Sequence, residues 1–256
     1  MSKNLFDLTG KVALVTGGNG GIGLGMAEGL AQHGASTIIW GQDGDKNAAA
    51  LARLEMTGAQ VSAVKIDVTD EDAVKAGLGA ILEEFGRLDN AVANAGMQQK
   101  RDSLFDISIE DFRLMEDVNI HGVLFTLREA ARHMIERGGG GSLVAISSTS
   151  AIHGASRNEH YAATKGAVVT MSRAMAVELA RHRISVNSIC PGWTRSDMTK
   201  SAQVWDKFNT NVISRVPMKG WAEGEDFAAI AVYLASEASR YHTGDTIVID
   251  GGYTIY

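Results

Sequence analysis

The chain has 256 residues, of which 45% are hydrophobic and 21% charged, and it contains 29 glycines but only 2 prolines. These proportions exclude a disordered or fibrous chain and are typical of a folded α/β protein, so we expect residues 1–256 to form a single domain. The formal net charge of -6 and the lack of a dense Lys/Arg run argue against a nucleic-acid partner.

Cysteine content and hydropathy indicate the cellular compartment of the protein and the kinds of partner it can have. Cys190 is the single cysteine, which excludes an intrachain disulfide and leaves no cysteine-based metal-ligand spacing. No long apolar segment precedes the first predicted strand, and no run of about 18 apolar residues occurs elsewhere. We therefore expect a cytoplasmic protein with no bound metal, no membrane contact and small molecules as partners.

Seven short β-rich runs alternate with longer helical patterns. These runs cover residues 11–16, 36–40, 60–66, 88–93, 142–146, 184–189 and 246–249. Between the third and fourth runs, apolar side chains repeat at helical spacing from Val74 to Phe85. The alternation predicts an α/β fold with a doubly wound, seven-stranded, mainly parallel sheet and helices on both faces. In such a fold, ligands bind at the carboxyl ends of the strands.

A glycine-rich turn, TGGNGGIG, follows the first predicted strand and opens a helical pattern. Gly17, Gly21 and Gly23 would permit a tight turn, allow close approach of a pyrophosphate and leave helix-end amides for its negative charge. A purely structural turn would also explain these glycines. Their position after the first strand favours a dinucleotide site.

The end of the second predicted strand bears on the choice of cofactor. A dinucleotide site usually has an acid here for the ribose hydroxyls, but Gly41 provides neither that acid nor a base for a 2'-phosphate. Asn19 and Gln42 can bond ribose or phosphate, and Asp43 either replaces the missing acid or faces water. We expect NAD or NADP, with a lean toward NAD because no cation obviously awaits a 2'-phosphate.

Tyr161 and Lys165 are four residues apart in a segment of good helix formers, so both side chains should lie on one helix face. An ammonium near a phenol favours the phenolate and lowers the tyrosine pKa from its usual value of about 10. The same spacing also occurs by chance on ordinary surface helices.

Six motifs together resemble those of the short-chain dehydrogenase/reductase family. In chain order they are TGGNGGIG, ANAG at 93–96, VNIHG at 118–122, ISS at 146–148, YAATK at 161–165 and NSICPGWTRSDM at 187–198. The resemblance covers nearly the whole chain. It implies a Rossmann-like fold and an NAD(P)-dependent oxidoreductase that transfers hydride between nicotinamide and a secondary alcohol or ketone.

The resemblance also implies the catalytic roles. Tyr161 looks like the general acid or base, and Lys165 like the group that lowers its pKa and holds the nicotinamide ribose. Ser148 is similar to the serine that bonds the substrate oxygen, whereas Ser147 fits a structural role. Asn119 matches the asparagine that holds a proton-relay water.

By the same resemblance, the cofactor would contact the glycine-rich turn, several strand ends and the turn after the sixth strand. The implied contacts are Gly17, Asn19, Gly21, Ile22, Gly23, Gly41, Gln42, Asp67, Val68, Asn94, Gly96, Tyr161, Lys165, Pro191, Gly192, Thr194 and Ser196. Asn94 could instead mainly brace the sheet. Ser196 stands where a threonine is more usual in the family, and it retains the hydroxyl.

Substrate contacts are expected beyond Ser148 and in residues 193–218, which we interpret as a lid over the substrate. The preferred contacts are His153, Trp193 and Met198, and the further candidates are Arg157, His160, Arg195, Trp205 and Phe208.

Four alternative functions stay open: 3-ketoacyl thioester reductase, sugar or polyol 1-dehydrogenase, steroid or aromatic alcohol chemistry, and a nicotinamide-binding sensor without turnover. Enoyl reduction fits less well, because family members of that type resemble a tyrosine and lysine set further apart. The resemblance also implies a homo-oligomer, often a tetramer.

Overall fold

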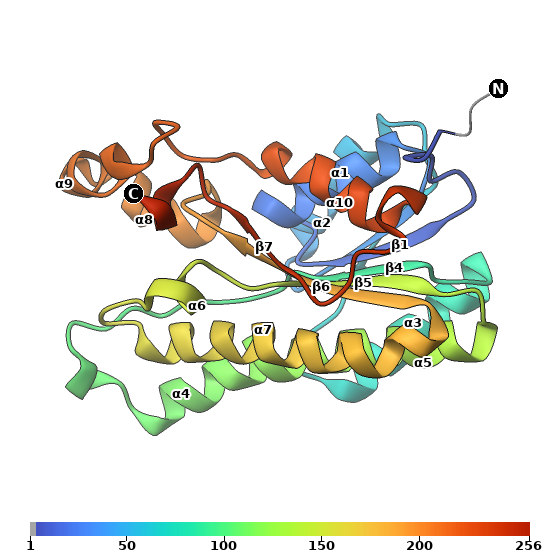
Figure 1. The fold of residues 1–256 in the computed structure, drawn as a ribbon, viewed down its shortest axis with the longest axis horizontal. Helices are drawn as coiled ribbons and strands as arrows, with labels where there is room; N and C mark the ends of the chain where they lie inside the picture. Colours follow the sequence, from blue (N-terminus) through green and yellow to red (C-terminus); the bar gives the residue numbers. More distant parts are fainter. Residues whose placement is uncertain (1–3) are drawn as a thin grey trace.

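The computed structural model describes residues 4–256, which form a central sheet between two layers of helices (Figure 1). All strands are parallel and lie in the order β3-β2-β1-β4-β5-β6-β7. Their bounds are β1 (Val12–Thr16), β2 (Ser36–Gly41), β3 (Val61–Lys65), β4 (Asn90–Ala93), β5 (Gly141–Ile146), β6 (Ile184–Pro191) and β7 (Thr246–Ile249). The predicted fold class and all seven predicted strands are confirmed, with boundaries shifted by at most two residues.

Helices cover both faces of the sheet. One layer contains α3 (Glu71–Phe85), α5 (Gly122–Arg137) and α7 (Glu159–Leu179), and the other contains α1 (Gly21–Gln32), α2 (Gly44–Glu55) and α10 (Ala228–Ala235) (Figure 1). The remaining α-helices are α4 (Ile109–Glu116), α6 (Ser150–His153), α8 (Lys200–Gln203) and α9 (Asp206–Asn211). Helices α6, α8 and α9 gather at the left end of the view, beside the C-terminus (Figure 1). Among residues 4–256, no helix is both long and apolar enough to cross a membrane.

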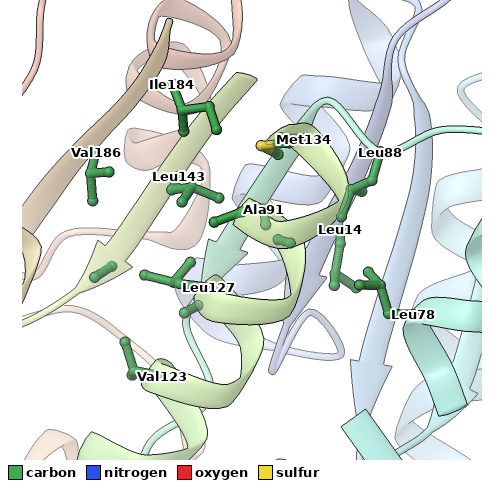
Figure 2. Packing of buried hydrophobic residues seen from close by; sticks show 14 of the residues in the cluster. Leu14, Leu78, Leu88, Ala91, Val123, Leu127, Met134, Leu143, Ile184 and Val186 are labelled. Carbon is green, nitrogen blue, oxygen red and sulfur yellow. The ribbon is translucent and has the colours of Figure 1, made fainter. Parts of the chain in front are cut away.

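Alternate strand residues fill two separate hydrophobic clusters. Leu14 of β1 faces the α3, α5 and α7 layer, whereas its neighbour Val15 packs toward α1 and α2. Figure 2 shows the first cluster, where Leu127 and Met134 of α5 lie over the strands. Because the inner strands β1, β2 and β4 bury both faces, their side chains are largely apolar, as expected for a parallel sheet under two helical layers. The edge strands β3 and β7 are only partly buried.

Acidic side chains define where two of the helices begin. The Asp43 carboxylate accepts hydrogen bonds from the backbone amides of Asp45 and Lys46 and caps α2. Asp70 caps α3 in the same way. Asp43 therefore stabilises a helix end at this position, which accounts for its carboxylate without a ribose contact.

A close backbone approach anchors the glycine-rich end of α1. A Cβ at Gly25 would lie 2.0 Å from the backbone oxygen of Gly224, which precedes α10. Only a glycine lets the two backbones come this close. The contact ties α1 to the segment between residue 218 and α10.

We expect Gly25→Ala to lower the free energy of unfolding by about 1–3 kcal/mol, because the backbone of residue 224 must move away. Chemical denaturation measures the loss. Gly79→Ala in α3 is the matched control, since a Cβ there meets nothing within 4 Å. The control should gain up to about 1 kcal/mol from better helix propensity. Equal effects of the two substitutions would contradict a tight contact at Gly25.

Candidate active site

A cavity of about 1240 Å³ lies at the carboxyl ends of the central strands. The glycine-rich turn, the ends of β4 and β5, the first turns of α7 and residues 191–212 all contribute to its lining. The location agrees with the rule that parallel α/β sheets bind ligands where the strands end.

Helix α7 brings Tyr161 and Lys165 to this cavity on one face, as the sequence predicted. Both side chains are buried, with relative exposures of 8% and 3%. The Lys165 Nζ donates a hydrogen bond of 2.9 Å to the carbonyl oxygen of Ile146, at the end of β5. It lies 5.7 Å from the centroid of the Tyr161 ring. The β5 carbonyl therefore holds the ammonium close to the phenol.

Burial dominates the protonation of both groups. It raises the pKa of Tyr161, against a hydrogen bond with Ser148 that acts in the opposite direction. Burial lowers the pKa of Lys165 from its ordinary value of 10.5 to about 8. The expectation that Lys165 lowers the tyrosine pKa was wrong: burial raises the pKa of Tyr161, and the hydrogen bond from Ser148 is the influence that favours the phenolate here.

The two serines after β5 have different surroundings. Ser148 is partly buried, lines the cavity and hydrogen-bonds to Tyr161. Its hydroxyl oxygen also accepts a hydrogen bond of 3.1 Å from the Ser150 amide. The Ser147 hydroxyl donates to the Lys165 backbone carbonyl at 2.7 Å, which fastens α7 to β5. This contact is the structural role that the sequence suggested for Ser147.

Asn119 lies in a π-helical turn, Asp117–His121, between α4 and α5. Its side chain is fully buried, accepts from the Met97 amide and donates to the Met97 carbonyl, both at 2.9 Å. A Cβ at Gly96 would lie 3.2 Å from Asn119 Oδ1 and 3.3 Å from Lys165 Nζ. Glycine at position 96 therefore leaves room between the amide and the ammonium. Such a turn inside a helix is frequent at functional sites.

The glycine-rich turn fits the pyrophosphate of a dinucleotide. Helix α1 begins after Gly20 without a side-chain cap, so its first amides are available to an anion. A Cβ at Gly17 or Gly23 would collide with the Asn94 side chain at 2.8 and 2.4 Å. The Asn94 amide donates to the carbonyls of Thr16 and Gly17 and thus braces this turn. NAD(P) would bind along these residues and beside Tyr161 and Lys165.

The adenosine end is built from neutral amides. A Cβ at Gly41 would lie 2.2 Å from Asn19 Nδ2 and 2.4 Å from Asn47 Oδ1, and these two atoms hydrogen-bond at 2.7 Å. The space that an acid at position 41 would need is therefore filled. Gln42 hydrogen-bonds to the Asp67 carboxylate, which helps to lower the pKa of Asp67 against the opposing effect of burial.

Most predicted site residues line the cavity. They are Gly17, Asn19, Gly21, Ile22, Asn94, Gly96, Ser148, His153, Tyr161, Lys165, Pro191, Gly192, Trp193, Thr194, Ser196 and Met198. Six predicted residues do not line it: Gly23, Gly41, Gln42, Asp67, Val68 and Asn119.

Two further candidates for substrate contact were wrong. His160 is fully buried against Phe112 of α4, and Arg157 is also absent from the cavity lining. His160 is next to Tyr161 in α7, so its side chain leaves the helix in a different direction, and Arg157 precedes the helix. Trp205, Phe208 and Arg195 do line the cavity, and Arg195 forms an ion pair of 3.0 Å with Glu223.

Sequence reasoning missed Gln98, Lys100 and Tyr253 as lining residues. Tyr253 is the most informative omission, because it comes from the last residues of the chain and returns to the cavity beside His153. An aromatic residue directly after the DGG turn was the available signal.

The chain belongs to the short-chain dehydrogenase/reductase family. The family model that matches residues 17–254 is described as enoyl-(acyl carrier protein) reductase. The chain is also 36% identical to the gluconate 5-dehydrogenase of Gluconobacter oxydans (strain 621H) over 252 residues, 98% of each chain. It is 33% identical to a 3-oxoacyl-[acyl-carrier-protein] reductase of Chlamydia pneumoniae, covering 96% of this chain and 98% of the relative.

A solved structure shows the same relationship. The gluconate 5-dehydrogenase from Burkholderia cenocepacia J2315, crystallised with NADP and tartrate, has a TM-score of 0.92 and 32% identity over 98% of both chains. Family membership and these relatives make the chain an NAD(P)-dependent oxidoreductase that acts on secondary alcohol and ketone groups.

The buried ammonium leads to a prediction about stability and pH. Since the pKa of Lys165 is about 8 in the folded chain and 10.5 ordinarily, the unfolded chain binds more protons between these values. The free energy of unfolding of the wild type should therefore rise, relative to that of Lys165→Met, as the pH increases from 8 to 10. Denaturant titrations at several pH values measure this difference.

Lys75→Met provides the control with the opposite sign. The hydrogen bond with Glu71 raises the pKa of the exposed Lys75 above 10.5, so the wild type should lose stability relative to this variant as the pH rises beyond that value, with little change between pH 8 and 10. If the free energy of unfolding of the wild type relative to Lys165→Met stays constant or falls with pH, burial does not lower the pKa of Lys165.

Proposed function

We propose that Tyr161 is the general acid and base of a reversible alcohol–ketone conversion, with Ser148, Lys165 and Asn119 as its partners. The observation that carries the proposal is the buried Tyr161, hydrogen-bonded to Ser148 and facing a cavity that Lys165 also lines. A sensor without turnover has no need of a buried acid–base group at the mouth of a cofactor site, so catalysis is the better explanation.

The nicotinamide, when bound, supplies or accepts the hydride. In reduction, the Tyr161 hydroxyl gives its proton to the substrate oxygen as negative charge develops there, and Ser148 donates a hydrogen bond to the same oxygen. In oxidation, the tyrosine oxygen removes the alcohol proton. The hydrogen bond from Ser148 favours the anionic form of Tyr161, and the space at Gly96 beside Asn119 and Lys165 suits a water that returns protons to the site.

The names of relatives do not define the substrate. Relatives of similar identity are named as a gluconate 5-dehydrogenase and as an acyl-carrier-protein reductase. Both convert between alcohol and ketone, and both cover nearly the whole chain. The shared core of the site therefore supports the reaction type, and the open alternatives of sugar oxidation and thioester reduction depend on the residues around it.

Residues 193–218 are proposed as a substrate lid on one catalytic domain. Several contacts join this segment to the rest of the chain, and two of them lie at its start. Lys46 of α2 forms an ion pair of 2.7 Å with Asp197, and Gln98 donates a hydrogen bond of 2.9 Å to the Met198 carbonyl. Both contacts hold neighbouring residues near the start of the segment, and the segment also lines the cavity, as a substrate lid would.

The homotetramer and the cytoplasmic location also belong to the proposal. The family supports the tetramer, while Val168 and Leu179 of α7 are occupied in the core of the chain itself. The single cysteine supports a reducing compartment.

We expect Tyr161→Phe to lower kcat by about 10²- to 10⁴-fold, because the substituted ring cannot exchange a proton with the substrate oxygen. Fluorescence titration should give an unchanged dissociation constant for the cofactor. Tyr233→Phe is the matched control, since its hydroxyl contacts His242 outside the cavity, and it should keep full activity. Substantial residual turnover in Tyr161→Phe would sink the assignment.

NAD is the proposed preferred cofactor. The amides of Asn19 and Asn47 fill the position of the usual acid, and the nearby cation Lys46 is paired with Asp197. We expect NADH to bind more tightly than NADPH in a fluorescence titration without substrate. Tighter binding of NADPH, with that preference lost in Lys46→Met, would show that Lys46 turns to a 2'-phosphate.

A further inference from the structure

Aromatic side chains form a continuous wall on the substrate side of the cavity. Trp193 meets Phe208 edge-on, with ring centroids 4.8 Å apart and an interplanar angle of 83°. Trp193 also meets Tyr253 edge-on at 6.2 Å, and Tyr253 meets the His153 ring edge-on at 5.7 Å. These geometries are the favoured ones for aromatic pairs, so the rings hold one another in place.

The wall begins next to the catalytic residues. His153 follows Ser148 by five residues at the end of α6, Trp193 follows β6, and Tyr253 comes from the C-terminal segment. Phe208 of α9 lies between two indoles, stacked at 6.2 Å on Trp205 and at 5.8 Å on Trp221. Trp193, Phe208, Tyr253 and His153 all line the cavity that contains Tyr161.

Several polar side chains around this wall are already engaged, although the buried Oδ1 of Asn158, which also lines the cavity, has no partner among residues 4–256. The amide of Gln98 donates to the Met198 carbonyl, and that of Gln203 donates to the Ser196 carbonyl at 3.0 Å. The Trp221 indole donates to Asn209 Oδ1 at 2.8 Å. A substrate with many hydroxyls needs several free partners, because each buried polar group left unpaired is costly.

The arginines near the wall are also occupied by protein groups. Arg215 lies 5.4 Å from the centroid of the Tyr253 ring, and Arg195 pairs with Glu223 and lies 5.9 Å from the Trp221 ring. Apart from the buried Lys165, the lysines of the lining are Lys100 and Lys200, which are exposed and therefore hydrated at the surface. These four cations therefore do not form a buried site that could bind a substrate carboxylate through two parallel hydrogen bonds from an arginine.

We propose that the substrate is a secondary alcohol or ketone carried by an uncharged ring or fused-ring skeleton, which packs on the faces and edges of Trp193, Phe208 and Tyr253. His153 Nδ1 is engaged with the Gly154 carbonyl at 2.7 Å, and its other ring nitrogen is available for a single distal polar group. This substrate class rests on the proposed function of the same site. It differs from the open-chain sugar acids in the names of the relatives.

The test compares substrates of both kinds on the purified full-length protein with NAD(H) and NADP(H). The ring panel is 1-phenylethanol, 1-tetralol and the corresponding ketones, and the open-chain panel is D-gluconate and D-sorbitol. We expect kcat/KM to be at least about tenfold higher for 1-tetralol than for gluconate, since burial of one ring is worth a factor of this size or more.

Trp193→Ala and Phe208→Leu should each raise KM for 1-tetralol by about 10- to 100-fold, through loss of apolar contact. In both variants kcat/KM should fall by a larger factor for 1-tetralol than for 2-propanol, which has no ring to pack on the wall. Two independent variants keep the test valid if one fails to fold. Tyr241→Ala is the control, because Tyr241 is fully exposed and outside the cavity, and it should change neither substrate.

Binding of 1-tetralone to Tyr161→Phe, followed by tryptophan fluorescence, separates the two proposals. Binding that weakens in Trp193→Ala supports the ring-bearing substrate even where turnover of this ketone is slow. Absence of such binding, or a higher kcat/KM for gluconate or sorbitol than for every ring substrate, overturns the substrate class and leaves the catalytic roles intact. Full activity of Tyr161→Phe would instead overturn the proposed function.

Discussion

A buried ammonium is stable only where oxygen atoms accept hydrogen bonds from it, and Lys165 meets this requirement at the carboxyl end of β5. The Ile146 carbonyl accepts its hydrogen bond, and the Ser147 hydroxyl ties the lysine backbone to the same strand end. These contacts set the height of α7 over the sheet. The positions of Tyr161 and of the cavity wall that it forms follow from them.

The second constraint is the close packing of glycines around the cofactor groove. Gly17 and Gly23 let the Asn94 side chain brace the turn between β1 and α1, and Gly96 leaves room between Asn119 and Lys165. Any side chain at these positions would occupy space that backbone or amide groups now use. The shape of the groove therefore depends on the absence of side chains at these three glycines as well as on the groups that line it.

Reaction and substrate are controlled by different parts of the chain. Ser148 directly follows β5, and Tyr161 and Lys165 lie in α7. Both elements pack into the sheet and its core (Figure 2). The aromatic wall is assembled from α6, α9, the turn after β6 and the C-terminal segment, all gathered at one end of the molecule (Figure 1). Loops on a rigid scaffold can change without disturbing the chemistry, which explains how relatives with this core bear the names of different substrates.

The sequence by itself determined the seven-stranded parallel sheet and the pairing of Tyr161 with Lys165, because both depend on local periodicity. Alternating strand and helix patterns predict the layers, and a spacing of four places two side chains on one helix face. The tertiary structure alone decided the neutral packing of Asn19 and Asn47 against Gly41, the burial of His160 away from the cavity and the return of Tyr253 to His153. Each of these joins residues from separate segments, so the contact exists only once the chain has folded and no local pattern encodes it.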